Sequence, residues 1–468
     1  MAKIVIIGAG SGFGSRLSID IMSREALRDS TICLCDLHEG RLKRVTDYVK
    51  ATVEKYHLPT KIESSTDRTK LLPGTDFVIT SVAVGGGAYY GFPFREEVEI
   101  PRKYGVDQAV ADTYSVGATF RLLRTAPVQL QICRDIEKYC PNAWLLNHTN
   151  PMVGLTMVHS LGSGVKNVGI CHGVQNTAHE LAEFLGLKDD EVTYKVSGIN
   201  HLAWFLQYQR ADTGEDLYPL IRETLANPQT EAQKEFLTKE AVRIEVLNKF
   251  GYFPTESNHH DSEYMPYFRR TPELREFYHL TFRRPIPDKL SGAMARDWMK
   301  DSVEGEGQLT GELKLSREYT SGIMEGILTD KPFRFNGNVM NKGLITNLPA
   351  KLCVEVPCFA DRFGVNPTVV GDLPTHLAGI NHANAVCVQL AVESILEKDK
   401  EKAFYAVALD PNVASTNSLD NIRKMFNELW DAEGDLMEWY WKDHVTERYA
   451  PVLRGFPIGK TPDRKRRK

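Results

Sequence analysis

The sequence lacks the features that mark several large classes of protein. Its 468 residues include eight cysteines, which do not pair in the sequence into a disulfide framework, so we expect reduced thiols and a cytoplasmic location. No apolar run approaches the length of a membrane span, and no basic and apolar leader precedes the first strand-like segment. The net charge of −4 gives no reason to expect nucleic acid or an acidic membrane as partner. The absences favour a globular protein with a small-molecule ligand.

What the sequence does contain is a regular alternation of strand-like and helix-like segments in its first 190 residues. Short apolar runs read as buried strands, and longer runs with a period near 3.6 residues read as helices. Strands are expected at 3–7, 31–37, 61–65 and 75–84, with two more ending at Asn147 and near Cys171, and helices at 15–24, 40–56 and 116–137. This alternation is typical of a Rossmann-like doubly wound α/β sheet. We therefore predict a dinucleotide-binding domain at residues 1–190.

Residues 191–468 are predicted to form a second, α+β lobe that binds substrate and supplies catalytic groups. A chain of this length exceeds what one hydrophobic core usually supports, and no flexible linker separates the two lobes. We expect strands at 191–209, 335–346 and 351–359, helices at 230–250, 293–315, 373–397 and 419–433, and an irregular loop or lid at 251–287. The cleft between the lobes is expected to be rigid and shared.

The segment "GAGSGFG" at residues 8–14 looks built to hold a dinucleotide. Gly8 and Gly10 stand where a tight turn and close backbone approach to a pyrophosphate are needed, and Ser11 lies in the same turn. The match to GxGxxG is partial, because Phe13 occupies the third glycine position. Asp36 ends the second strand, where its carboxylate can accept from a ribose hydroxyl and would repel a 2′-phosphate. The loop predicts NAD rather than NADP, although Asp36 could instead cap the next helix.

Cys171 and His201 are the candidate metal ligands. A thiol and an imidazole are borderline-soft ligands, and their separation of 30 positions fits neither a zinc finger nor a zinc ribbon, so a metal here would sit at an open, reactive site. Each residue alone is more often a buried structural thiol or a core histidine. Asn147, Asn150 and His172 are expected at the same strand ends, where ligands bind in α/β sheets. Together with the nucleotide loop, the pair favours a metal site.

A second segment rich in proton-transfer groups is "TESNHHDSEY", at residues 255–264. It contains carboxylates, two histidines and a tyrosine within ten residues. Such a stretch can be a solvated loop, but it is also where a general base is expected.

At this point the sequence resembles family 4 of the glycoside hydrolases, whose members use NAD and a divalent metal and depart from two-carboxylate hydrolysis. The resemblance runs through most of the chain and rests on several motifs in order. They are "GAGS" at 8–11, "DTYSVGATFRLLRTAPV" at 112–128, "NHTNPM" at 147–152, "CHG" at 171–173, "GINHLAWF" at 198–205, and later "FPTES…EY", "NKGLITNLP" and "VEVPCFADRFGVNPTVVGDLP". The resemblance implies a lactate/malate dehydrogenase-like fold and a homo-oligomer, dimer or tetramer.

Within the family, the residues after the metal-binding cysteine track the substrate. Cys-Asp and Cys-Asn accompany phosphorylated sugars, whereas Cys-His, as at Cys171-His172, accompanies unphosphorylated α-glycosides. The resemblance therefore implies hydrolysis of an α-glycoside, with α-galactosides as the first expectation. Gly173 replaces the serine common in α-galactosidases and α-glucosidases, which leaves an α-galacturonide or α-glucuronide open.

The mechanism that the resemblance implies is transient oxidation of the sugar at C3 by NAD, followed by elimination. Cys171 and His201 would hold Mn²⁺ or another divalent metal, while Asn150 and Asn200 would contact the sugar. His172 would assist the leaving group.

Less direct roles fall to the remaining acids and histidines. Asp112 would bind sugar or orient a proton carrier. Glu256 is favoured as the base that removes the C2 proton, with His260 and Asp261 as rivals.

Two other classes of protein compete with this interpretation. A 2-hydroxy-acid dehydrogenase of the malate/lactate type also carries "TNP" after a strand, but it needs an Arg and an Asp on the following helix, and "MVGLTMVHSLGSG" has neither. A non-catalytic NAD-sensing protein would not need the pair Cys171 and His201.

Overall fold

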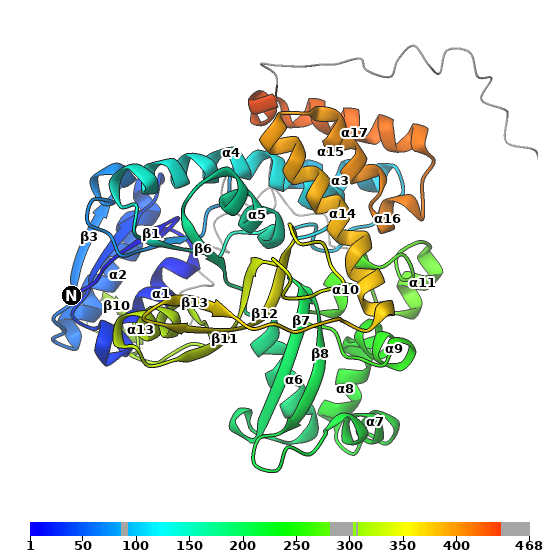
Figure 1. Cartoon of the computed structure of the whole chain (residues 1–468), viewed down its shortest axis with the longest axis horizontal. Coiled ribbons are helices and arrows are strands. Elements are labelled where there is room, and N and C mark those ends of the chain that lie inside the picture. The colour runs from blue at the N-terminus through cyan, green and yellow to red at the C-terminus, as the bar shows by residue number, and fades with distance from the viewer. Residues whose placement is uncertain (86–91, 281–302, 306–307, 441–468) are drawn as a thin grey trace, which may run out of the picture.

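One large sheet runs through the chain (Figure 1). The computed structural model describes residues 1–85, 92–280, 303–305 and 308–440. Within these residues the strand order is β3-β2-β1-β4-β5-β6-β11-β12-β7-β8, and β13 pairs with β12. The first six positions are parallel neighbours, β1 (Lys3–Ile7), β2 (Thr31–Cys35), β3 (Lys61–Ser65), β4 (Phe77–Thr80), β5 (Trp144–Asn147) and β6 (Lys166–Gly169). The predicted Rossmann-like sheet is therefore confirmed.

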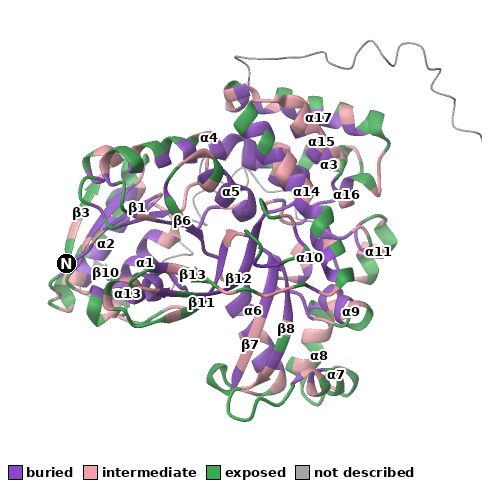
Figure 2. Cartoon of the chain, in the orientation of Figure 1, coloured by how far each residue is buried: buried purple, intermediate pink, exposed green. Residues whose placement is uncertain are grey.

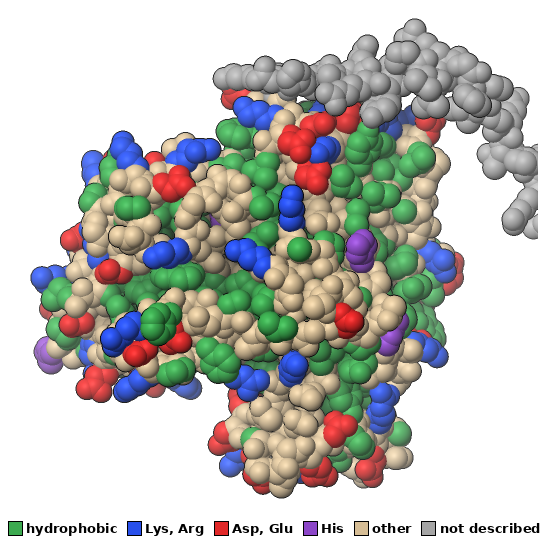
Figure 3. Space-filling view, viewed as in Figure 1, with side chains coloured by type: hydrophobic (Ala, Val, Ile, Leu, Met, Phe, Trp, Pro, Cys, Tyr) green, Lys and Arg blue, Asp and Glu red, His purple; other side chains and the backbone are tan. Residues whose placement is uncertain are grey.

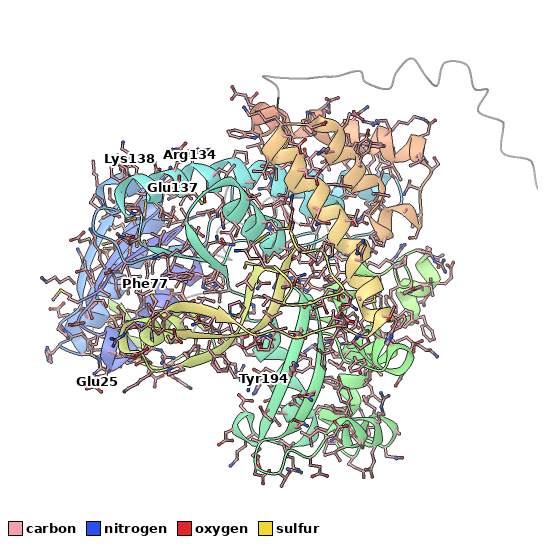
Figure 4. All side chains as sticks on the ribbon, in the orientation of Figure 1. Glu25, Phe77, Arg134, Glu137, Lys138 and Tyr194 are labelled. Atoms are coloured by element: carbon pink, nitrogen blue, oxygen red, sulfur yellow. The ribbon has the colours of Figure 1, made fainter. Side chains whose placement is uncertain are left out.

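Helices cover both faces of the parallel strands. The helices of the first 190 residues are α1 (Gly12–Ser23), α2 (Glu39–Lys55), α3 (Phe94–Lys103), α4 (Ser115–Tyr139), α5 (Met152–Gly162) and α6 (Gly173–Leu185), with 3₁₀ turns η1 (Glu25–Leu27), η2 (Arg68–Lys70) and η3 (Asp189–Glu191). The last turns of α4 show why such a helix docks on one side only. Ile132 and Ile136 are buried, whereas Arg134, Glu137 and Lys138 are exposed and point away from the sheet (Figure 4).

The second half of the chain extends the same sheet with antiparallel strands. These are β7 (Val192–Ile199), β8 (Leu202–Arg210), β11 (Phe333–Met340), β12 (Cys353–Asp361) and β13 (Gly364–Pro367). Single residue pairs join β11 and β12 to their neighbours in the sheet. Asn338 of β11 pairs with Gly169 of β6, and Glu355 of β12 pairs with Gly198 of β7. The two glycines lie two and three residues before Cys171 and His201 respectively, so this junction positions the site.

The remaining helices pack on this extension, on one another or on α3, α4 and α5. They are α7 (Tyr218–Ala226), α8 (Glu231–Lys239), α9 (Ala241–Phe250), α10 (Asn258–Tyr264), α11 (Pro272–Phe277), α13 (Thr320–Thr329), α14 (Thr375–Glu397), α15 (Lys400–Ala408), α16 (Pro411–Ala414), α17 (Leu419–Glu433) and the 3₁₀ turn η4 (Gly434–Tyr440). The largest buried cluster takes side chains from both halves, for example Leu123 of α4, Leu155 of α5 and Val388 of α14 (Figure 2). The two halves thus share one core.

The surface carries no dominant charge on the face drawn in Figure 3, where acidic and basic side chains are interspersed. All eight cysteines are buried and free. Among the described residues, none of the helices combines the length and the apolar character that crossing a bilayer requires.

Two expectations about the second half need correction. The segment 251–287 is not simply irregular: α10 and α11 form within it, because Ser257 accepts from the His260 amide and Thr271 accepts from the Leu274 amide at the two helix starts. The helix expected at 293–315 is wrong where it can be seen, since β9 (Val303–Gly305) and β10 (Gln308–Thr310) pair as antiparallel strands. Residues 281–287, 293–302 and 306–307 lie outside the described residues.

Candidate active site

Three side chains from separate segments meet where the parallel and antiparallel strands join. Cys171 follows β6, His201 lies in the turn between β7 and β8, and Glu256 lies between α9 and α10. Cys171 Sγ is 3.1 Å from His201 Nε2, and Glu256 Oε1 is 3.3 Å from that nitrogen and 3.6 Å from the sulfur. A thiolate, an imidazole and a carboxylate within this reach form a donor set that fits a divalent metal ion.

The backbone around these groups is held in an unusual conformation. His201 and Glu256 have φ angles of +61° and +74°, a region that residues other than glycine rarely adopt. Thr177 Oγ1 accepts from the Glu256 amide at 3.1 Å, and the buried Arg243 guanidinium donates to the Glu256 carbonyl oxygen. The Thr113 hydroxyl bonds His201 Nδ1 at 2.8 Å, which leaves Nε2 facing Cys171. Strained residues held by their surroundings are typical of functional sites.

The charge states of the pair are set by burial. Burial and the carboxylates of Glu256 and Glu355 hold the pKa of the Cys171 thiol well above its ordinary value. Burial lowers the pKa of His201, against the opposing charge of Glu256. The ring is therefore neutral, as a metal-binding imidazole must be, and the thiol gives up its proton when a cation binds.

His260 and Asp112 form a second group beside the first. His260 Nε2 is 3.6 Å from Asp112 Oδ1, and His260 Nδ1 is 3.7 Å from Glu256 Oε2. Burial lowers the pKa of His260, but the hydrogen bond to Asp112 and the charges of both carboxylates outweigh it and raise the pKa to about 9. Burial raises the pKa of Asp112, and the nearby His260, His201 and Arg121 outweigh burial and hold it well below its usual range. Asn150 Nδ2 lies 3.5 Å from Asp112 Oδ2, so this amide joins the group.

His172 reaches the site from the start of α6 with a half-exposed side chain. Its Nδ1 is 3.2 Å from Glu318 Oε1, and this hydrogen bond raises the pKa of His172 against the effect of burial. The other carboxylate oxygen of Glu318 lies 4.0 Å from His148 Nδ1. Sequence reasoning missed Glu318, because no local pattern shows that residue 318 returns to residue 172.

The structure does not bring every predicted residue to the site surface. Asp261 is fully buried, and neither carboxylate oxygen has a hydrogen-bond partner among the described residues. The Asn200 side chain is also fully buried, and neither its Oδ1 nor its Nδ2 has a hydrogen-bond partner among the described residues. Asn147 is occupied in holding its own turn, accepting from Thr80 Oγ1 at 2.9 Å.

The segment 255–264 also carries two residues whose tasks the sequence did not reveal. Glu263 accepts from the backbone amides of Ala109 and Ala111 at 2.7 and 3.0 Å, and so fixes the loop that leads into Asp112. The buried Tyr264 hydroxyl has no hydrogen-bond partner among the described residues. Both residues lie on α10 with His260, but only the folded chain shows what they face.

The glycine loop has the geometry of a close backbone approach. Gly8 has φ +87°, and a Cβ there would lie 2.0 Å from the Ser81 carbonyl oxygen. A Cβ at Gly14 would lie 1.9 Å from the Ala9 carbonyl oxygen. The third position at which only glycine fits is therefore Gly14, one residue beyond the Phe13 that the motif indicated.

The other predicted cofactor residues surround this loop. The Gly10 amide donates to Asp36 Oδ2 at 2.9 Å, while Ser11 Oγ donates to the Gly8 carbonyl at 2.9 Å. The Phe13 ring packs 5.1 Å from the ring of His148. The side chain that caps α2 is His38 rather than Asp36, although Asp36 Oδ1 accepts from the His38 amide at 2.8 Å.

Comparison with known proteins identifies the family. The sequence model described as "Family 4 glycosyl hydrolase" matches residues 3–187, and "Family 4 glycosyl hydrolase C-terminal domain" matches residues 196–413. The chain belongs to family 4 of the glycosyl hydrolases. The predicted membership and enzyme class are thus confirmed, and the membership favours a hydrolase over the 2-hydroxy-acid dehydrogenase left open by the sequence.

Relatives of this family 4 glycosyl hydrolase match it over nearly their whole length. It is 37% identical to an α-galactosidase of Bacillus subtilis (strain 168), over 94% of this chain and 100% of that protein. It is 35% identical to an α-galactosidase of Rhizobium meliloti (strain 1021), over 94% and 89% of the two chains. A crystal structure of a 6-phospho-α-glucosidase from gut microorganisms, in complex with NAD and Mn²⁺, superposes with a TM-score of 0.78 at 20% identity, over 93% and 98%. At that identity the likeness shows the shared fold.

Proposed function

We propose that this family 4 glycosyl hydrolase is an NAD- and divalent-metal-dependent glycosidase that hydrolyses unphosphorylated α-glycosides, α-galactosides first. The observation that carries the proposal is the contact of Cys171 with His201 at 3.1 Å, with His172 and the His260–Asp112 pair beside it. The names of the two α-galactosidases over whole-length matches support the choice of sugar.

The residues of the site fit both NAD and a divalent metal ion. A glycine turn in which Gly8, Gly10 and Gly14 admit no Cβ, with Asp36 at its edge, suits NAD, and the thiol, imidazole and carboxylate suit Mn²⁺. Transient oxidation at sugar C3 is the chemistry that bound NAD supplies, and a divalent metal supplies Lewis acidity at the C2 and C3 oxygens.

The chain's own side chains then handle the protons. Glu256 and His260 are the proposed bases for the proton on C2, and both side chains retain some exposure, at 12% and 15%. Asp261 is fully buried, which weakens it as a rival. His172, the most exposed of the group, is proposed to assist the departing glycosidic oxygen, with Glu318 fixing its ring.

Sugar binding is proposed for Asn150 and Asp112, whose side chains lie 3.5 Å apart beside the metal group. Because its side chain is buried, Asn200 is proposed to influence the metal ligand Cys171 rather than to contact the sugar. Gly173 supports one second candidate, an α-galacturonide or α-glucuronide, since no side chain stands there to contact the sugar.

We also propose that residues 1–190 hold NAD, and that residues 191–468 hold the sugar together with Asp112, Asn150 and His172 of the first domain. A cytoplasmic homo-oligomer, dimer or tetramer, remains our proposal for the working form. The eight buried free thiols support a reducing location.

The test is a panel of nitrophenyl α- and β-glycosides, uronides included, with NAD⁺, Mn²⁺ and a thiol reductant. We expect the α-galactoside to be cleaved only with NAD⁺ present and without net accumulation of NADH. Cleavage of a uronide alone would establish the second candidate. Steady NADH formation from a hydroxy acid, without glycoside cleavage, would contradict the proposal.

A further inference from the structure

The carboxylate of Glu256 is aimed at the pair of predicted metal ligands. Oε1 lies 3.3 Å from His201 Nε2 and 3.6 Å from Cys171 Sγ, while Oε2 faces His260. Because Thr113 occupies His201 Nδ1, the nitrogen left for a metal is the one that faces Glu256. The three donor atoms therefore converge on one point from three different segments.

Gly173 is what makes room for this carboxylate. A Cβ built on Gly173 would lie 2.1 Å from Glu256 Oε1 and 2.9 Å from its Cδ, closer than any real contact. Any side chain at residue 173 would therefore push the carboxylate away from Cys171 and His201. The identity of residue 173 and the position of Glu256 are thus linked by space.

Glu256 is held in place by a strained backbone conformation and by a buried, charged arginine. Its left-handed backbone is fixed by Thr177 and Arg243, and Arg243 is itself buried against Glu240 Oε2 and Glu180 Oε2, each at 2.7 Å. A carboxylate that served only to accept from a thiol would not require such a support. Preorganisation of this kind is typical of a ligand or catalytic group.

A third, hard ligand also accounts for the choice of metal. Thiolate and imidazole together suit Zn²⁺ or Cu²⁺, whereas carboxylate oxygens suit Mn²⁺ and Mg²⁺. Catalytic metal sites commonly use three protein ligands and keep one position open for water or substrate. A thiolate and a carboxylate also balance the two positive charges of a divalent cation inside a buried site.

We propose that Glu256 is the third protein ligand of the metal and that Gly173 is the residue that admits it. The proposal rests on the proposed function, which supplies the metal itself. It assigns Glu256 to the metal rather than to the C2 proton.

The experiment measures Mn²⁺ and Co²⁺ binding to the NAD-free protein, using the Co²⁺ absorption spectrum to report the ligands. Glu256→Gln keeps the size and a hydrogen-bond acceptor but loses the charge, and should weaken binding by ~10-fold or more, since even outer partners of ligands are worth 10–100-fold. Gly173→Ala should weaken binding as well. Gly379→Ala is the matched control, a helical glycine of α14 whose added Cβ meets nothing within 4 Å, and it should bind normally.

A double-mutant cycle tests whether Gly173 acts through Glu256. In a Glu256→Ala protein, which has no carboxylate to displace, Gly173→Ala should cause no further loss of metal affinity. Wild-type affinity and spectrum in both Glu256 variants would overturn the proposal, and an equal loss from Gly173→Ala in both backgrounds would overturn the role of Gly173. Cys171→Ser distinguishes failure of this proposal from failure of the proposed function. If this variant also binds metal normally, the proposed function itself fails.

Discussion

The nucleotide loop and the metal group are built in opposite ways. The loop is a contiguous stretch, residues 8–14, whose shape follows from where a Cβ cannot fit and from backbone amides. The metal group takes Cys171, His201 and Glu256 from three segments, of which the first two follow β6 and β7, and β6 and β7 are joined in the sheet through β11 and β12. Local chemistry specifies the first region, and topology specifies the second.

The two regions also differ in charge. Around the glycine turn the named polar contacts are backbone amides with one carboxylate, Asp36. The metal region holds several buried ionisable groups whose pKa values shift one another. A path of contacts joins them, from Phe13 to His148, Glu318 and His172. If this path couples the two regions only weakly, a substitution that abolishes metal binding should leave NAD⁺ binding intact, and the reverse.

The largest effect is expected from Cys171→Ser. A serine hydroxyl is hardly ionised at neutral pH, so metal binding should collapse and glycosidase activity should fall on the order of 10³-fold, as expected for several kcal/mol of lost charge stabilisation. NAD⁺ affinity should stay near wild type, because the glycine loop is untouched. Titration of Mn²⁺ and NAD⁺ into both proteins measures this. A parallel loss of NAD⁺ binding would show that the two regions are coupled.

Glu355→Gln probes the buried charge behind the metal group. Burial and the charge of Glu256 raise the pKa of Glu355 to about 8, against the amides of Asn200 and Asn338. The folded state thus keeps a proton that the unfolded chain releases above its ordinary value of 4.5, so wild-type stability should fall as pH rises from about 4.5 to 8 and level off above.

The variant should remove that part of the pH dependence, on the order of a few kcal/mol. Urea unfolding of the metal-free proteins at pH 5 and pH 8 measures the difference. Asp20→Asn in α1 is the control from the nucleotide half. Burial raises the pKa of Asp20 to about 6 against its bonds to Ser316, so its effect should be confined to lower pH. Identical slopes in wild type and Glu355→Gln would contradict the assignment.

The two regions also show what could be predicted from the sequence. The limits of β1 and α17 agree with the expectation, because an apolar run sets the ends of β1 and a clear helical period sets those of α17. The limits of β3 also agree, although its sequence KIESS holds a single apolar residue. The six-residue α11 and seven-residue α10 were not seen, because their caps and tertiary contacts decide them. Helices this short have too few turns for a helical periodicity to appear in the sequence.

The site shows the same division. Cys171 and His201 could be predicted from residue type and flanking motifs, and the structure brings them together. Glu318 and Thr113 could not, because each touches a histidine far along the chain, at 3.2 and 2.8 Å. Pairing over such separations depends on the strand order, which local patterns do not contain.

Gly8→Ala is the converse of Cys171→Ser, because it should weaken NAD⁺ binding and leave metal binding unchanged. The added Cβ would meet the Ser81 carbonyl at 2.0 Å in a backbone of φ +87°, so the turn must move. A cost of about 1–3 kcal/mol predicts NAD⁺ binding weaker by ~10–100-fold, with Mn²⁺ affinity unchanged. Gly74→Ala is the control, since it shares the positive φ of +76° but meets nothing within 4 Å. Equal NAD⁺ affinity in both variants would refute the close approach.

The smallest effect is expected from Asp36→Ala, which keeps the turn but removes its one carboxylate. Asp36 holds the Gly10 amide at 2.9 Å and the His38 amide at 2.8 Å, and it is placed to accept from a ribose hydroxyl. A lost charged hydrogen bond of about 1.5 kcal/mol predicts NAD⁺ binding ~10-fold weaker. NADP⁺ should bind no worse, because the charge that repels a 2′-phosphate is gone. Asp36→Asn helps to separate the two causes, since it removes the charge but keeps one oxygen that can accept from the Gly10 or the His38 amide. Calorimetric titration of both nucleotides decides, and unchanged affinity for each in both variants would remove Asp36 from the ribose site.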